Sequence, residues 1–254
     1  MGAATGTTTG PRHPGDPVTI SGVLTGALAI YRRHFLRVAL SAVPVFAAIG
    51  ALSLGILALE VQLAHGTDGT RFGAFLLLVI GAGFVRSLGT VVYSGFLDEA
   101  VGADLDGRTP PAIFEAIRDL PAGRLLVADL VTTIAVGLAT AFLVLPGLAV
   151  LTLVGIVGPV INTERHGVRD GIRRSVSLVS RRFWTCAALL IPLAFVEHAV
   201  EGWFVLTVEG VPVVSSVVLG VVLGVTIGAT VGLIEVVLAH GLMRADRAVA
   251  SRAT

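Results

Sequence analysis

The sequence predicts an all-α fold, a polytopic bundle of about six transmembrane helices with three amphipathic helices on its cytoplasmic face. Hydrophobic residues make up 54% of the 254-residue chain and charged residues only 14%, whereas about a quarter of a soluble domain is charged. Long apolar stretches alternate with short polar ones, which favours one lipid-embedded bundle over soluble domains. The arginines collect in every second connection between the apolar stretches.

Six stretches reach or approach the ~20 apolar residues that cross a bilayer. The fourth is short, and it is separated from the third only by Leu145, Pro146 and Gly147. A Pro-Gly pair breaks helices and suits a tight turn, so we expect a helical hairpin here. A single re-entrant hairpin is the alternative. The predicted spans are 35–61, 72–97, 125–145, 148–161, 183–204 and 211–243.

The arginines predict the orientation of the bundle. They precede the first span, follow the last, and fill the connections between spans two and three and between spans four and five. Because positive residues stay in the cytoplasm, we expect both termini there. A composition rich in Ala, Gly and Val, with Arg in place of Lys, is typical of a prokaryote, so the membrane is expected to be the plasma membrane. We divide the chain into a disordered tail 1–17 without a signal-peptide core, a six-span domain 18–246 and a tail 247–254.

A short amphipathic segment precedes each pair of spans, near 20–35, 113–120 and 168–180. Such a helix lies in the membrane interface with its arginines near anionic headgroups. The threefold pattern suggests an internal repeat, although basic connections are often amphipathic without one. In the third segment the predicted apolar stripe is Val168, Ile172, Val176 and Val179, with Arg169, Arg173 and Arg174 facing away.

The last span contains glycines at a four-residue spacing, which lets two helix backbones approach closely. Packing within the chain is the favoured interpretation, and homodimerisation is the alternative. The predicted packing face consists of Gly220, Gly224, Gly228 and Gly232.

Three ionisable residues are expected inside the hydrocarbon, where a charge must be paired or hydrated. Arg86 lies in the second span, Asp129 in the third and Glu235 in the sixth. We expect Arg86 to pair with Asp129 or Glu235. The pair would either fix the arrangement of the helices or form a substrate or proton site of a transporter.

Two further polar groups allow binding hypotheses. Glu197, His198 and Glu201 have a spacing compatible with a metal or a proton relay, but water near the outer interface explains them equally well. An acidic group in the loop from 98 to 124 does not match a calcium-binding loop and is expected to be solvated. We therefore predict no metal and no cofactor. The acidic group consists of Asp98, Glu99, Asp104, Asp106 and Glu115.

The chain lacks the motifs of common catalytic sites. It contains no phosphate-binding loop, zinc-protease helix, nucleophile elbow or Cys-x-x-Cys pair. No soluble segment is long enough to hold an active site or a nucleic-acid interface. We therefore expect neither an enzyme nor a nucleic-acid partner. Cys186 is alone and forms no intrachain disulfide.

Two stretches carry a family resemblance. Residues 23–40 (VLTGALAIYRRHFLRVAL) and 158–184 (GPVINTERHGVRDGIRRSVSLVSRRFW) resemble the membrane domain of the glycerophosphoryl diester phosphodiesterase family and the YciC-type proteins beside it. Gly171 stands where the family pattern has Ala, and the family's Tyr-x-Asp-x-Arg stretch after span six is not retained. The resemblance implies six spans, without the catalytic domain. The matching positions are Pro159, Glu164, Arg174, Ser175, Leu178, Phe183 and Trp184.

Two function classes follow from these features. The first is a non-catalytic membrane module that acts as a scaffold, a regulator or a lipid-associated protein, as a homodimer or with another protein partner. The alternative is a permease, or the membrane subunit of a small-solute transporter, that uses Arg86, Asp129 and Glu235. A hydrated cavity around these three residues would favour the permease, and a dry, ion-paired core would favour the module.

Overall fold

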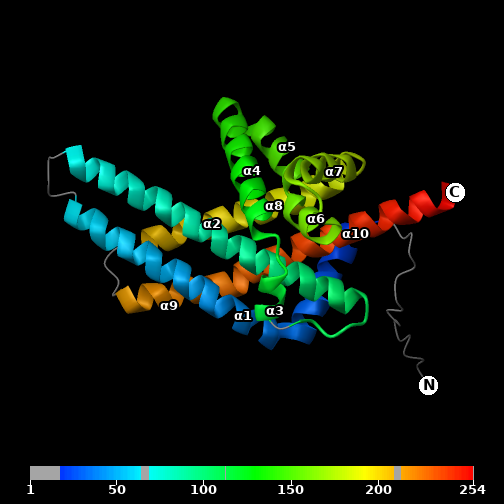
Figure 1. Cartoon of the computed structure of the whole chain (residues 1–254), viewed down its shortest axis with the longest axis horizontal. Helices are drawn as coiled ribbons and strands as arrows, with labels where there is room; N and C mark the ends of the chain where they lie inside the picture. Colours follow the sequence, from blue (N-terminus) through cyan, green and yellow to red (C-terminus); the bar gives the residue numbers. More distant parts are fainter. Residues whose placement is uncertain (1–17, 64–68, 112, 209–212, 254) are drawn as a thin grey trace, which may run out of the picture.

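The computed structural model describes residues 18–63, 69–111, 113–208 and 213–253, and every regular element within them is a helix (Figure 1). Four long rods run along the longest axis. They are α1 (Ile20–Leu63), α2 (Gly69–Leu105), α8 (Phe183–Val208), and α9 (Val213–Leu223) joined through a π-helical turn, η1 (Gly224–Gly228), to α10 (Ala229–Ala253).

Several helix ends lie together at one end of the long axis. Helix α1 begins, α2 ends and α10 ends at the same end of the molecule (Figure 1). The short helices α3 (Ile113–Arg118), α6 (Val157–Glu164) and α7 (Val168–Ser180) gather toward this end. We call it the Arg-rich end, because it carries Arg33, Arg108, Arg165, Arg174 and Arg244.

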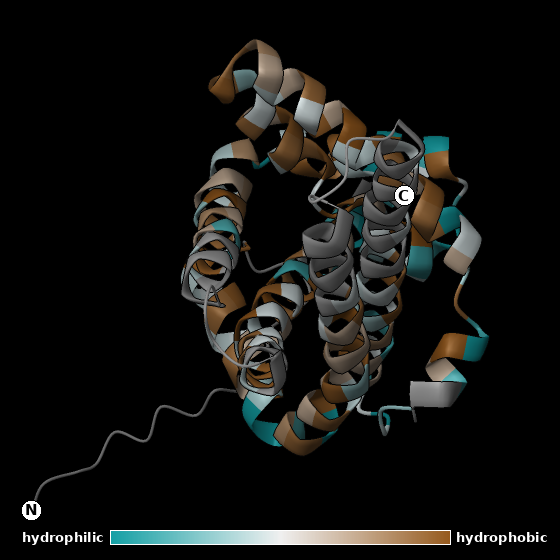
Figure 2. Cartoon of the chain, turned by 90° about the vertical axis from the view of Figure 1, so that its left-hand side faces the viewer, coloured by the Kyte–Doolittle hydropathy of each residue, from teal (hydrophilic) through white to brown (hydrophobic). Residues whose placement is uncertain are grey.

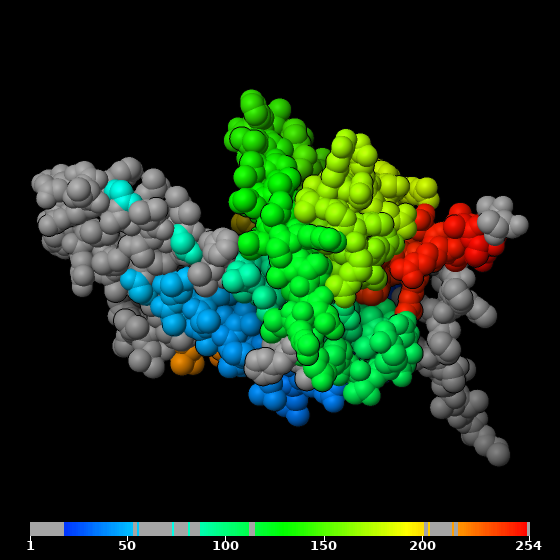
Figure 3. All heavy atoms as spheres, viewed as in Figure 1, coloured from blue at the N-terminus to red at the C-terminus, as the bar shows by residue number. Residues whose placement is uncertain are grey.

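Helices α4 (Ala122–Phe142) and α5 (Val144–Val154) form the predicted hairpin and project sideways from the long rods (Figures 1 and 3). The predicted turn is displaced. The chain reverses at Leu143, where the backbone is extended (φ −161°, ψ 141°), and Pro146 and Gly147 lie in the first turn of α5. Proline is tolerated there because first-turn N–H groups have no acceptor within the helix.

Five segments are long and apolar enough to cross a membrane, among the residues that the structure describes. The second predicted span, 72–97, lies within α2, which is continuous over 37 residues, but many of its side chains fall outside the described set. The exterior is apolar: Phe142 is 84% exposed and Phe195 75%, and Figure 2 shows hydrophobic residues over much of the hairpin. Such a surface requires lipid around it. The chain is an all-α integral membrane protein. The five segments are Ile20–Leu52, Ala122–Phe142, Val144–Glu164, Phe183–Val200 and Val218–Arg252.

The glycines of the last rod pack against α1 and α2. A Cβ atom on Gly228 would lie 2.9 Å from Cζ of Phe46, one on Gly224 would overlap the same ring, and one on Gly232 would lie 2.9 Å from Cδ1 of Leu97. In an α-helix a four-residue spacing overshoots a full turn by about 40°, and the wider π turn offsets this drift. Phe46 therefore meets both Gly224 and Gly228. Gly220 lies one turn earlier, in α9.

The amphipathic segments differ from one another in the structure. The first is the start of α1, which kinks at His34 (φ −114°, ψ 19°), and the second, α3, has only six residues. The predicted apolar stripe of the third, α7, is displaced around the helix. Small residues allow close helix packing, and a Cβ atom on Gly171 would lie 3.0 Å from Cδ1 of Ile161. The buried residues of α7 are Gly171, Ser175, Leu178 and Val179.

Candidate functional site

A buried carboxylate joins three helices at the Arg-rich end. The Asp98 side chain of α2 is 3% exposed. Its Oδ2 accepts hydrogen bonds from Asn162 Nδ2 (2.6 Å) and Thr163 Oγ1 (3.0 Å) of α6, and its Oδ1 lies 2.9 Å from Nε2 of His240 on α10. These contacts compensate the cost of burying the carboxylate.

Asn162 leaves one polar atom without a partner. An ionised carboxylate only accepts hydrogen bonds, so the Asn162 amide nitrogen must face Asp98 and the amide oxygen must point elsewhere. That oxygen, Oδ1, is buried and accepts no hydrogen bond within the part of the chain that the structure describes.

A polar cavity of about 220 Å³ opens beside this cluster. The buried residues Asp98, Asn162 and His240 line its inner part. Exposed arginines line its outer part, so the cavity passes from a hydrogen-bonding interior to a basic rim. The arginines of the rim are Arg108, Arg165, Arg244 and Arg247.

Most of the rim arginines form ion pairs. Asp106 accepts from Arg108 (3.0 Å) and Arg244 (3.1 Å). The hydrogen bond from Arg108, with the charges of both arginines, holds the pKa of Asp106 below its usual value. Arg165 lies 3.6 Å from Glu99. Arg247 forms no ion pair with any residue in the described ranges.

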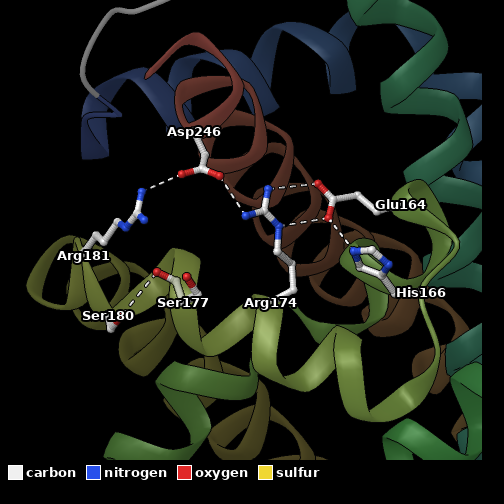
Figure 4. A network of polar contacts seen from close by, with 7 residues as sticks. All are labelled: Glu164, His166, Arg174, Ser177, Ser180, Arg181 and Asp246. Atoms are coloured by element: carbon white, nitrogen blue, oxygen red, sulfur yellow. Dashed lines mark hydrogen bonds and ion pairs between the residues drawn. The ribbon is translucent and has the colours of Figure 1, made fainter. Parts of the chain in front are cut away.

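A second network lies beside the cavity (Figure 4). The Arg174 guanidinium donates to Glu164 through Nε (3.0 Å) and to Asp246 through Nη1 (2.8 Å). Asp246 also accepts from Arg181 (2.6 Å), and His166 lies 3.2 Å from Glu164. The hydrogen bond to Glu164, followed by that to Asp246, raises the pKa of Arg174. Arg174 therefore ties α7 to α6 and α10. It does not face away from the protein, as its place in the sequence suggested.

Several residues on which the expected family resemblance rests have structural roles near this network. Glu164 and Arg174 form the ion pair, and the Ser175 hydroxyl donates to the carbonyl of Leu153 on α5 (2.7 Å). Pro159 and Leu178 are buried, whereas Trp184 is 82% exposed. A comparison with protein-family models, curated proteins and solved structures finds no match to this chain. What the site does chemically is therefore inferred from its own residues.

The kink of α1 is also held by a carboxylate of α2. Asp104 accepts from Arg33 (2.9 Å) and lies 2.8 Å from Nε2 of His34. Burial opposes ionisation of Asp104, but the hydrogen bonds from His34 and Arg33 outweigh it and lower the carboxyl pKa.

The predicted solvation of the acidic loop is wrong for Asp98 and Asp104. Helix α2 continues to Leu105, eight residues beyond the predicted end of the second span. The signal was present in the sequence, because Asp98 shares a helical face with the buried Val101. A hydropathy criterion ends the span at the first charge and misses this continuation.

The pairing of Arg86 with Asp129 or Glu235 stays a prediction, because it needs a side chain beyond the part of the chain that the structure describes. The Arg86 side chain lies outside that part. Asp129 on α4 accepts a hydrogen bond from Ser87 of α2. Glu235 lies on α10, and no hydrogen bond or ion pair links it to a described side chain. Neither carboxylate lines the cavity.

The structure shows no metal-binding cluster among the described residues of the group Glu197, His198 and Glu201. His198 Nδ1 lies 2.8 Å from the carbonyl oxygen of Ala194 in its own helix. Glu197 is half-buried one residue earlier, and the Glu201 side chain is outside the described set.

Proposed function

We propose that the protein is a non-catalytic membrane module, a scaffold or regulatory protein of a prokaryotic plasma membrane. In this proposal the Arg-rich end lies in the cytoplasm and α7 rests on anionic lipid headgroups.

The outer face of α7 carries the proposal. Arg169 and Arg173 are exposed and form no ion pair with a described residue, whereas Arg174 turns inward to Glu164 and Asp246. Trp184 follows, near the start of α8, and is 82% exposed. Tryptophan prefers the membrane interface, and each arginine near an anionic surface contributes about 1 kcal/mol.

A permease has less support. The described cavity lies at the Arg-rich end, and its lining includes neither Asp129 nor Glu235. The polar residues of the Arg-rich end are largely paired with one another, as expected of a module whose contacts hold its helices together.

Lipid enrichment tests the proposal. The full chain is purified from bilayers that contain phosphatidylglycerol and phosphatidylcholine, and the retained lipids are quantified by mass spectrometry. The double variant Arg169→Gln, Arg173→Gln is expected to lower the enrichment of phosphatidylglycerol several-fold, since ~1 kcal/mol per arginine corresponds to about fivefold.

The matched control is the double variant Arg124→Gln, Arg252→Gln, which removes the same charge from exposed positions outside the three amphipathic segments. It should leave the enrichment nearly unchanged. Equal losses in the two double variants, or no loss in either, would overturn the role of α7.

A further inference from the structure

A hydrogen-bond acceptor beside the cavity at Asp98 has no donor among the described residues. Asn162 lines the cavity and is 2% exposed, and its Oδ1 is buried and has no hydrogen-bond partner among the described residues. Asp98 fixes the amide nitrogen, so the amide cannot turn to satisfy its oxygen. A buried acceptor without a donor is unfavourable, and a hydroxyl group entering the cavity would remove that cost.

The arginines at the rim of the cavity favour an anionic ligand. Arg108 and Arg244 share Asp106, and Arg165 lies 3.6 Å from Glu99 and donates a hydrogen bond to the carbonyl of Asp119 (2.7 Å). Arg247 has no ion pair among the described residues, and it lies three residues from Arg244 on the same face of α10. A metal ion is disfavoured here, because four arginines surround the entrance and the three carboxylates of the lining, Asp98, Glu99 and Asp106, are already paired with protein donors.

The positions of the arginines and the volume of the cavity indicate which class of ligand fits. Arginines approach from α10 and from the segment after α6, so a group with acceptors in several directions fits better than a planar carboxylate. Phosphate has this geometry. The volume of about 220 Å³ is that of roughly seven waters at ~30 Å³ each, and it lies below the ~300–1,000 Å³ of pockets for drug-sized ligands.

We propose that this cavity binds a small hydroxyl-bearing phosphate ester, with the phosphate at Arg244 and Arg247 and a hydroxyl donating to Asn162 Oδ1. The ester is either a free cytoplasmic metabolite or the headgroup of a lipid. The site is separate from the outer face of α7, so its test does not depend on that of the proposed function.

Two probes and two variants test the site in the full chain, held in phosphatidylcholine nanodiscs and titrated by calorimetry. Glycerol 3-phosphate is expected to bind, and n-propyl phosphate, which lacks the hydroxyls, about tenfold more weakly. Arg247→Gln should weaken glycerol 3-phosphate about tenfold. Arg252→Gln, five residues further along α10 and outside the cavity lining, should stay within twofold.

A second experiment measures how much phosphatidylglycerol the same variants retain when they are purified from bilayers that contain this lipid. If the free ester does not bind but Arg247→Gln lowers retention of phosphatidylglycerol and Arg252→Gln does not, the ester is a lipid headgroup. Loss of selectivity in both arms overturns the proposal. So does measurable binding of both probes with equal affinity, or equal effects of the two variants. Unchanged melting temperatures show that both variants are folded.

Discussion

Two adjacent arginines of α7 have opposite environments. Arg173 is exposed, whereas Arg174 is bound by Glu164 and Asp246, whose side chains are only 15% and 21% exposed. Removal of Arg174 leaves Glu164 with His166 alone and Asp246 with Arg181 alone, and both carboxylates are largely buried, so it costs more than the loss of a surface charge.

We expect Arg174→Met to lower the free energy of unfolding by about 1–3 kcal/mol. Arg173→Met should change it by less than ~0.5 kcal/mol, as is usual for an exposed position. Unfolding in mixed micelles, followed by circular dichroism, measures both values. Equal values for the two variants would contradict the inward position of Arg174.

Helices α4 and α5 approach each other closely at Gly147. A Cβ atom on Gly147 would lie 2.8 Å from Cα of Thr140, whereas one on Gly137 would meet nothing within 4 Å. Both glycines lie in helical segments of the same hairpin. A comparison of alanine substitutions at the two glycines therefore distinguishes the effect of tertiary packing from the effect of helix propensity.

Gly147→Ala is expected to destabilise the protein by about 1–3 kcal/mol, because the added methyl group pushes α5 away from the backbone of α4. Gly137→Ala should stabilise it by up to ~1 kcal/mol through helix propensity. The melting temperatures in detergent report both effects. A stabilising Gly147→Ala would show that the two helices are not in close contact there.

The whole molecule places the beginning of α1 and the end of α10 at one end of its long axis (Figure 1). The start of α4, which carries Gly123, and the connection between α6 and α7, which carries Gly167, lie toward the same end, and both residues are exposed. Cys186 is 0% exposed, so it should not react with a polar reagent. The labelling of an introduced cysteine therefore reports the orientation of the protein, because the native Cys186 does not react.

A membrane-impermeant maleimide is expected to label Gly123→Cys, Gly167→Cys and Ala250→Cys in inverted vesicles and not in intact cells. Thr67→Cys, between α1 and α2, should show the reverse pattern. If any of the first three reacted in intact cells, the predicted cytoplasmic position of the Arg-rich end would be wrong.

Sequence alone was sufficient for the membrane class and the helical hairpin, because both depend on local composition. Apolar length and helix-breaking residues are properties of neighbouring positions. The polar cavity depends instead on long-range contacts. Asp98 and His240 are 142 residues apart, and Arg174 and Asp246 are 72 apart.

The rotation of each helix decided which polar side chains meet. The hydrophobic stripe predicted for α7 would turn Arg174 outward, but the small residues Gly171 and Ser175 take the contact face and turn Arg174 toward Glu164. Hydropathy does not detect a packing face made of small residues, since close approach depends on shape. The amino-acid sequence by itself thus determined a lipid-embedded helical protein with an asymmetric charge distribution. Only the tertiary structure decided that its acidic residues enclose a cavity with a basic rim.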